Sequence, residues 1–236
     1  MRVLALDTTT RAGSVALVEN GNLIAERPGD ASRSHGERLP ADLAQLGVPW
    51  SSVDVFAVCV GPGSFTGLRI GIATMQGLAL VTGARLIGIS GLDALAQYAT
   101  KCVGQGDLVA PWIDAQRGEV YSSLYRVTDA PLFTADRLVQ LEPPAVATAD
   151  ATFGLWTGHD LGEAMFIGDA AWHNALLIEA HTSHRRITEP LPLAGAIGLL
   201  AEDAARRGAT GSPAAIQPLY VRRPDAELHR DRNRPH

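Results

Sequence analysis

Gly-Pro-Gly-Ser-Phe-Thr-Gly-Leu-Arg-Ile-Gly, residues 61–71, joins an apolar strand predicted over residues 55–60 to a helix predicted over residues 64–81. Glycine accepts backbone angles and close approaches that a Cβ forbids. Ser64 is a good N-cap, and the free N–H groups behind it favour an anion. The stretch therefore predicts an α/β fold in which a strand leads through a tight turn into the amino end of a helix.

The helix over residues 64–81 has an unusual sequence, because Gly67, Gly71 and Gly77 all lie inside it. Each glycine costs about 1 kcal/mol relative to alanine, so another interaction must compensate. Gly67, Gly71 and Thr74 share one face at i, i+4 and i+7, which predicts a smooth surface for a second helix. The other faces are apolar, so the helix should be buried on more than one side. Two interpretations remain open: a core helix of a large domain, or a helix that binds a partner protein.

Composition places the chain among ordinary globular proteins. It has 236 residues, of which 46% are hydrophobic and 19% charged, with a net charge of −5. This size fits one or two domains, and the acidic balance argues against a stand-alone nucleic-acid binder. Cys59 and Cys102 give neither a disulfide framework nor zinc spacing. The amino end is too short for a signal peptide and no apolar run is long enough to span a membrane, so we expect a cytoplasmic protein.

A faint internal repeat is the main clue to domain organisation. An apolar strand ends in an aspartate, followed by a polar turn and an alternating strand, first at Asp7 and again at Asp114. We interpret Asp114 as capping N–H groups in a turn where Gly118 supplies a permissive angle. Two unrelated turns would explain the repeat equally well. Two similar halves, however, would give a bilobal, actin-like arrangement.

The individual elements follow from periodicity and turn signals. The first half has strands over 3–6, 14–18 and 23–26 around a hairpin turn at Asn20-Gly21, a helix over 36–46, then the strand and helix around residues 55–81, a strand over 85–89 and a helix over 92–100. The second half has strands over 108–113, 119–127 and 166–167, a short helix from 172 and a long helix over 193–207. We expect lobes over residues 1–104 and 105–221.

Residues 222–236 are predicted to be a flexible tail. Its five arginines are Arg222, Arg223, Arg230, Arg232 and Arg234. They could contact RNA phosphates, but a solvated terminus is the favoured interpretation.

Five motifs, in order along the chain, resemble those of the TsaB (YeaZ) family of actin-like proteins. They are Val-Leu-Ala-Leu-Asp-Thr-Thr at 3–9, Ser-His-Gly-Glu at 34–37, the glycine-rich stretch at 61–71, Ile-Asp-Ala-Gln-Arg-Gly-Glu-Val-Tyr at 113–121, and Gln-Pro-Leu-Tyr-Val-Arg at 217–222. Gln116 stands where the family often has arginine and Val221 where leucine is common. Residues 131–163 match only weakly.

The resemblance implies a fold, a process and partners. The fold would be a duplicated actin-like (RNase H-like) α/β fold, with two lobes of mixed sheets flanked by helices. The chain would be a non-catalytic subunit that binds a TsaD-like catalytic subunit and a TsaE-like ATPase. The complex would transfer threonylcarbamoyl from its adenylate to the tRNA adenine 3′ of the anticodon. ATP and a metal ion are expected in the partner subunits, none tightly bound by this chain, and a homodimer is expected when it is alone.

The histidine pattern agrees with a subunit that holds no catalytic metal. TsaD carries a His-x3-His pair, and the matching positions here are Gly91 and Leu95. His181 and His184 are close in sequence but have no evident third ligand, so a metal site there is disfavoured. His35 is expected to order the start of the helix over 36–46. No catalytic residue is expected.

Two sets of site residues follow. The expected partner interface is apolar and small, formed by Leu39, Leu43, Thr66, Gly67, Ile70, Gly71, Thr74 and Leu78. The possible neighbours of a phosphate are Asp7, Thr8, Gly61, Gly63 and Ser64. The second set keeps an alternative open, that of an actin-like ATPase or phosphotransferase.

Overall fold

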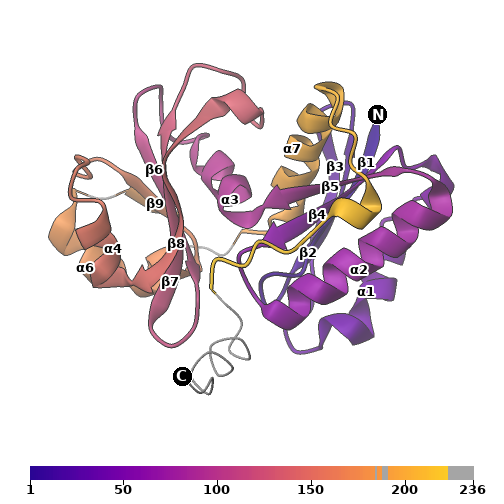
Figure 1. Ribbon diagram of the computed structural model, residues 1–236, viewed down its shortest axis with the longest axis horizontal. Helices are drawn as coiled ribbons and strands as arrows, with labels where there is room; N and C mark the ends of the chain where they lie inside the picture. The colour runs from indigo at the N-terminus through magenta and orange to yellow at the C-terminus, as the bar shows by residue number, and fades with distance from the viewer. Residues whose placement is uncertain (184, 188–190, 223–236) are drawn as a thin grey trace, which may run out of the picture.

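The computed structural model describes residues 1–183, 185–187 and 191–222, which form two lobes (Figure 1). His184 lies outside the described residues, and so does the part of the expected tail that follows Arg222. The first lobe holds a five-stranded sheet in the order β3-β2-β1-β4-β5, and the second a five-stranded sheet in the order β10-β9-β6-β7-β8. The strands are β1 (Arg2–Asp7), β2 (Ser14–Glu19), β3 (Asn22–Pro28), β4 (Val55–Gly61), β5 (Arg85–Ser90), β6 (Leu108–Asp114), β7 (Glu119–Val127), β8 (Leu138–Thr148), β9 (Met165–Ile167) and β10 (Arg185–Ile187).

The two sheets have the same topology. In the first, β1 pairs antiparallel with β2 and parallel with β4, β2 pairs antiparallel with β3, and β4 pairs parallel with β5. In the second, β6 pairs antiparallel with β7 and parallel with β9, β7 pairs antiparallel with β8, and β9 pairs parallel with β10, which repeats the same four relationships. The faint repeat at Asp7 and Asp114 thus marks a duplication, because both aspartates end the central strand of their sheet. The predicted two-lobed α/β fold with mixed sheets is confirmed.

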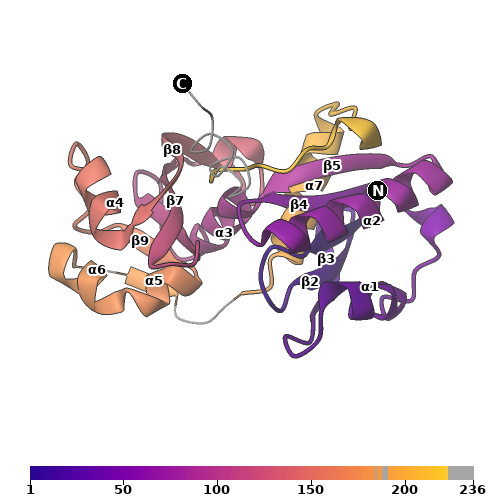
Figure 2. The same ribbon diagram turned by 60° about the horizontal axis from the view of Figure 1, so that its bottom comes forward.

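Helices cover the sheets. They are α1 (His35–Ala44), α2 (Phe65–Thr82), α3 (Gly91–Ala99), α4 (Ala149–Leu155), α5 (Asp169–His173), α6 (Ala175–His181) and α7 (Ala194–Arg206), with 3-10 turns η1 (Trp50–Ser52), η2 (Ala135–Arg137) and η3 (Pro213–Ala215). On one face of the first sheet, Leu4 and Leu6 pack with α1 and α2. On the other face, Val3 and Ala5 pack with α7. Figure 2 shows α4, α5 and α6 on the outer side of the second lobe.

Local sequence signals explain several element ends. Asn20 and Gly21 have φ of 51° and 79°, the left-handed angles that a two-residue hairpin turn between β2 and β3 requires. Ser34 and Glu37 form a capping box at the start of α1. Gly83, with φ of 72°, ends α2 in the left-handed conformation.

The structure differs from the expected elements mainly in the second lobe. The 11-residue β8 was not predicted, because Pro143-Pro144 interrupt its pattern. β8 lies at the edge of its sheet, where a proline needs no partner for its missing N–H. The short elements α4, α6 and β10 were also missed, and α5 begins at Asp169 rather than at residue 172.

The expected division into lobes also needs a correction. α7 and the residues after it fall within 105–221, yet α7 packs against β1, β2 and β4 of the first sheet. Its apolar face, including Ile197 and Ala201, belongs to the core that contains Val3 and Ala5. The chain therefore returns to the first lobe after completing the second.

Candidate functional site

A shallow apolar groove lies between α1 and α2 on the outside of the first lobe. It has a volume of about 180 Å³ and is lined by Gly36, Leu39, Pro40, Leu43, Trp50, Ile70, Thr74 and Leu78. Leu39 and Leu43 form its floor, being only 2% and 3% exposed, whereas Trp50 at its rim is 43% exposed. The leucine stripe of α1 is therefore shared between the core and an open surface. Sequence reasoning missed Trp50, which follows the apolar Val48 and Pro49 and was a visible signal.

The outer face of α2 continues this apolar surface. Leu80 and Val81 are 69% and 88% exposed, and Gly77 lies on the same exposed side with no neighbouring atom within 4 Å of a built Cβ. On the opposite side, Leu68 and Met75 are buried in the core. By length and composition alone α2 could cross a membrane, but its buried face packs on the sheet as a core helix does. An apolar helix surface of this kind is typical of a protein–protein contact.

Gly67 and Gly71 do not lie on this open surface, which corrects the expected partner interface. Both are buried, and a Cβ on Gly67 would lie 2.0 Å from the Thr8 carbonyl oxygen. A Cβ on Gly71 would lie 2.2 Å from Thr8 Oγ1. The close approach that these glycines permit is therefore to the loop after β1, within the lobe. Of the expected residues on α2, Ile70, Thr74 and Leu78 line the groove, and Thr66 is exposed nearby.

A second and larger cavity, about 1240 Å³, lies between the two lobes. The first lobe contributes Thr9, Thr10 and Ser64 to its lining, and the second contributes Asp114 and Asp169. Ser64 caps α2 by accepting a hydrogen bond from the Gly67 N–H at 3.2 Å, so the amino end of α2 faces this cavity. One wall of the cavity thus carries hydroxyl groups and the amino end of α2, and the other wall carries the carboxylates of Asp114 and Asp169.

Of the five expected phosphate neighbours, only Gly63 and Ser64 line the cavity. Asp7 and Thr8 are buried behind them. Asp7 Oδ1 accepts hydrogen bonds from the Thr9 N–H at 2.8 Å and the Thr9 hydroxyl at 2.6 Å. Burial raises the pKa of Asp7, and these bonds oppose the rise. Gly61 is also buried, and a Cβ on it would lie 3.0 Å from the Leu219 carbonyl oxygen and 3.3 Å from Leu68. Asp7 and Thr8 therefore shape the loop rather than reach the cavity.

Asp114 organises the turn between β6 and β7, as expected. Its Oδ1 accepts a hydrogen bond from the Gln116 N–H at 2.8 Å, and its Oδ2 accepts one from Gln116 Nε2 at 2.8 Å. Gln116 and Arg117 both have positive φ, 61° and 60°, and Gly118 follows with 75°. Asp169 Oδ1 accepts a hydrogen bond from the Asp114 N–H at 3.0 Å, which ties α5 to this turn.

His35 ties the start of α1 to the loop between β1 and β2. Its Nε2 lies 3.0 Å from the Thr10 carbonyl oxygen, and its Nδ1 lies 2.8 Å from Arg38 Nη2. Arg38 is buried and also bonds Asp42 and the Ala12 carbonyl. Because Arg38 can only donate, His35 Nδ1 accepts and Nε2 donates, which requires a neutral ring. Burial and the Arg38 charge lower the pKa of His35.

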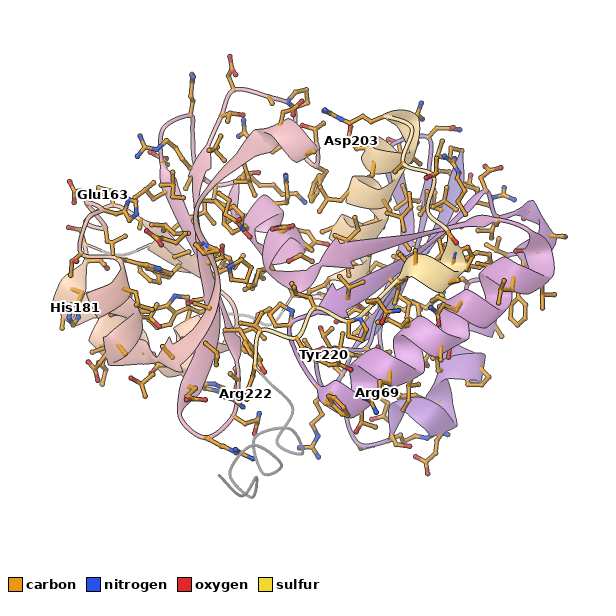
Figure 3. The ribbon with its side chains drawn as sticks, in the orientation of Figure 1. Arg69, Glu163, His181, Asp203, Tyr220 and Arg222 are labelled. Atoms are coloured by element: carbon orange, nitrogen blue, oxygen red, sulfur yellow. The ribbon has the colours of Figure 1, made fainter. Side chains whose placement is uncertain are left out.

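Tyr220 and Arg222 are functional candidates that sequence reasoning missed. Tyr220 stacks on Phe65 at the start of α2, and Arg222 pairs with Glu119 of β7. Figure 3 shows where Tyr220 and Arg222 lie. The signal was present in the motif at 217–222, but we placed Arg222 in a flexible tail. Its side chain is instead only 21% exposed. Within the described ranges, no cluster of three or more histidine, cysteine or acidic side chains could hold a metal ion.

Comparisons with known proteins identify the relatives of this fold. Residues 24–143 match the family model described as TsaD, tRNA N6-adenosine threonylcarbamoyltransferase. The tRNA threonylcarbamoyladenosine biosynthesis protein TsaB of Escherichia coli is 40% identical over 130 residues, which span 53% of this chain and 55% of that protein. TsaB of Bacillus subtilis is 31% identical, over 74% of this chain and 82% of that protein. The structure of YeaZ from Pseudomonas aeruginosa superposes with a TM-score of 0.74 at 30% identity, covering 93% of this chain and 99% of that one.

Proposed function

We propose that this chain, which belongs to the TsaB/YeaZ family, is a non-catalytic subunit in the formation of N6-threonylcarbamoyladenosine in tRNA. The catalytic partner would be a TsaD-like subunit, assisted by a TsaE-like ATPase. In this proposal the complex transfers the threonylcarbamoyl group to the adenine 3′ of the anticodon. ATP and metal would be held in the partner subunits, tRNA would be bound by the complex, and the process would take place in the cytoplasm.

The apolar surface over α1 and α2 is the observation that carries the subunit role. It combines the groove floored by Leu39 and Leu43 with the exposed side chains of Leu80 and Val81. Exposed apolar side chains that are grouped on one surface are costly in water and typically mark a contact with another protein. Gly77 on the same face would let a second helix approach closely.

The same surface would serve both a homodimer and the complex with the TsaD-like subunit. The TsaD family model matches residues 24–143, a range that includes both α1 and α2. Related helix pairs can then meet about a twofold or pseudo-twofold axis. Homodimer and heterodimer would compete, so the homodimer would dissociate when the partner is present.

An ATPase or phosphotransferase is the second candidate, supported by the cavity of about 1240 Å³ between the lobes. The hydroxyl of Ser64, at the amino end of α2, is a suitable phosphate neighbour there. Against this function, the Asp7 carboxylate is 2% exposed and already accepts bonds from its own loop. Submicromolar binding of ATP by the isolated chain would favour the enzyme.

Reconstitution tests the proposed function. The chain is incubated with threonylcarbamoyl-adenylate and unmodified tRNA, alone or with the TsaD-like and TsaE-like subunits, and the modified nucleoside is measured by mass spectrometry. We expect product from the complete mixture, none from this chain alone, and a loss of product when only this chain is left out. Product from the lone chain would contradict the subunit role.

A further inference from the structure

The segment after α7, residues 211–222, runs along the first lobe and then reaches the second; we call it the strap (Figure 1). Several hydrogen bonds hold it to the first lobe. The Gly211 carbonyl accepts from the Leu86 N–H at 3.1 Å, and the Pro213 carbonyl accepts from Gln76 Nε2 at 2.8 Å. Near its end, the Leu219 N–H donates to the Val60 carbonyl at 2.7 Å. The strap therefore follows β5, α2 and β4 in turn.

An aromatic stack strengthens the attachment to α2. The Tyr220 and Phe65 rings lie 5.4 Å apart between centroids, and the Arg69 guanidinium lies 3.9 Å from the Phe65 centroid. Arg69 Nε also donates to the Tyr220 hydroxyl at 3.3 Å. Figure 3 shows Arg69 and Tyr220 close together beside the start of α2. Up to Tyr220 these contacts are all with the first lobe.

Arg222 carries the strap across to the second lobe. Its Nη1 donates to the Ala115 carbonyl at 2.7 Å, its Nη2 pairs with Glu119, and its guanidinium lies 5.7 Å from the Tyr121 ring centroid. Ala115 and Glu119 flank the turn that Asp114 organises. A guanidinium can make both bonds at once because its N–H groups have a fixed, forked geometry.

The strap forms part of the wall of the cavity between the lobes. Leu219, Tyr220, Val221 and Arg222 all line it, next to Ser64 of the first lobe and Tyr121 of the second. A change in the position of Arg222 would therefore change the width of this cavity.

A second set of contacts joins the lobes far from Arg222. Arg207 of α7 pairs with Asp136 of η2 at 2.7 Å, and Asp203 accepts from the Ala135 N–H at 2.9 Å. On α3, Gln97 donates to the Thr134 carbonyl at 2.9 Å. Figure 3 places Asp203 and Arg222 at opposite ends of the boundary between the lobes. Several bonds thus join one end, whereas at the other end the polar contacts of the strap with the second lobe come from Arg222, beside Val221, which packs against the core shared by the lobes.

We propose that Arg222 is a releasable latch, and that breaking its contacts with Ala115 and Glu119 lets the lobes move apart and widens the cavity between them. The strap stays on the first lobe during this movement, because its own contacts there are independent of Arg222. The contacts around Asp203 and α3 act as the hinge. Arg222 is suited to reversible release, since an ion pair with a partly exposed carboxylate adds little stability. Hinge motion between lobes is a recurrent form of conformational change.

A distance measurement between the lobes tests the latch in the full chain. Spin labels are placed at Ala41 of α1 and Asp150 of α4, both exposed, in a Cys102→Ser background, since Cys102 is exposed and Cys59 is buried. Dilution with unlabelled chain limits the signal to distances within one molecule. We expect Arg222→Ala to shift the distribution to longer distances, with a smaller shift for Arg222→Lys and Glu119→Gln. Arg11→Ala is the matched control, because Arg11 lines the same cavity but bonds the Ala31 carbonyl in its own lobe.

Hydrogen exchange distinguishes release of the latch from loss of the whole strap. In Arg222→Ala the Leu219 amide should keep its protection, because its bond to the Val60 carbonyl lies within the first lobe. The proposal would be overturned if Arg222→Ala left the distance distribution unchanged, or if Arg11→Ala shifted it equally. It would also be overturned if the exchange rate of the Leu219 amide rose about tenfold or more in Arg222→Ala. If Arg222→Ala does not fold, the same distances are measured in Glu119→Gln, because Glu119 is the more exposed member of the ion pair.

Discussion

Gly71 in the middle of α2 lies directly against Thr8, so that a Cβ on this glycine would be 2.2 Å from Thr8 Oγ1. Thr8 in turn donates its hydroxyl proton to the Gly67 carbonyl at 2.8 Å. These two glycines thus let the loop after β1 rest on the helix that follows β4. The packing against Thr8 offsets the cost of these glycines in helix propensity. The open face of α2 is formed by other residues, including Leu80 and Val81.

Gly71 and Gly77 should therefore respond in opposite ways to alanine. We expect Gly71→Ala to lower the free energy of unfolding by about 1–3 kcal/mol, because the new methyl group must displace Thr8. Gly77→Ala should raise it by about 0.5–1 kcal/mol, because Gly77 is exposed within a helix and a Cβ there meets no atom. Urea unfolding measures both, in a Thr74→Arg background so that association does not contribute. The same sign of change for the two variants would contradict the packing described.

Thr74→Arg tests the proposed partner surface. Thr74 lines the groove between α1 and α2, and an arginine there would place a charge that a bound helix would have to bury. We expect a folded monomer that binds the TsaD-like subunit at least about a hundredfold more weakly, a loss typical of a central interface position. Light scattering and titration calorimetry measure the two effects. Val139→Arg, which adds the same charge to an exposed site on β8, should change neither. A Thr74→Arg variant that still dimerises and binds would place the interface elsewhere.

Asp114→Ala tests whether this carboxylate acts through the turn. Loss of the bond to the Gln116 N–H should lower the free energy of unfolding by about 1 kcal/mol. Asp114→Asn keeps an acceptor oxygen and should lose less. Thermal unfolding followed by circular dichroism measures both. If the Asp114→Ala melting temperature stays unchanged while activity of the reconstituted complex is lost, Asp114 has a direct functional role instead.

His35 should make the first lobe sensitive to mild acid. The pKa of His35 in the folded protein lies below its value of 6.5 in the unfolded chain. Burial and the Arg38 charge disfavour the protonated ring more than the Thr10 carbonyl, Asp7 and Asp42 favour it. As the pH falls below 6.5, the unfolded chain takes up a proton first, so stability is lost. We expect His35→Gln, which does not titrate, to show a weaker loss between pH 7 and about pH 5.5. Urea unfolding across this range measures the loss of stability. If the free energy of unfolding changed with pH at the same slope in the two proteins, the loss could not be assigned to His35.

The buried carboxylates change stability with pH in the opposite direction to His35. Burial raises the pKa of Asp7, Glu26 and Asp93 above their ordinary values of 3.8, 4.5 and 3.8. The folded protein therefore binds protons at these groups more readily than the unfolded chain. Their contribution to the free energy of unfolding increases as the pH falls toward those values, opposite in sign to the contribution of His35. Glu26 and Asp93 have no interaction with His35 among the causes of their pKa shifts, so they contribute about equally to both slopes. Asp7 differs, because the charge of His35 is one of the causes that lower its pKa, and this cause is absent in His35→Gln.

The local signals of the sequence determined turns and a helix start in both lobes. The Asn20-Gly21 hairpin, the capping box of Ser34 and Glu37 and the turn around Asp114 each depend on residues only a few positions apart. Such interactions form wherever the chain lies, so spacing alone predicts them. The repeated strand–aspartate–turn pattern likewise indicated two lobes, and the common topology of the two sheets confirmed them.

Only the tertiary structure decided which surfaces face outward and which contacts join the lobes. The sequence showed that α2 is apolar nearly all round, but not that Thr8 covers Gly67 and Gly71 while Leu80 and Val81 remain open. Nor did it show that Arg222 reaches Ala115, more than a hundred residues earlier. Helical periodicity says which residues share a face, but the neighbour of that face is set by segments far away in the chain. Their positions follow from the packing of whole sheets and helices, which no local pattern encodes.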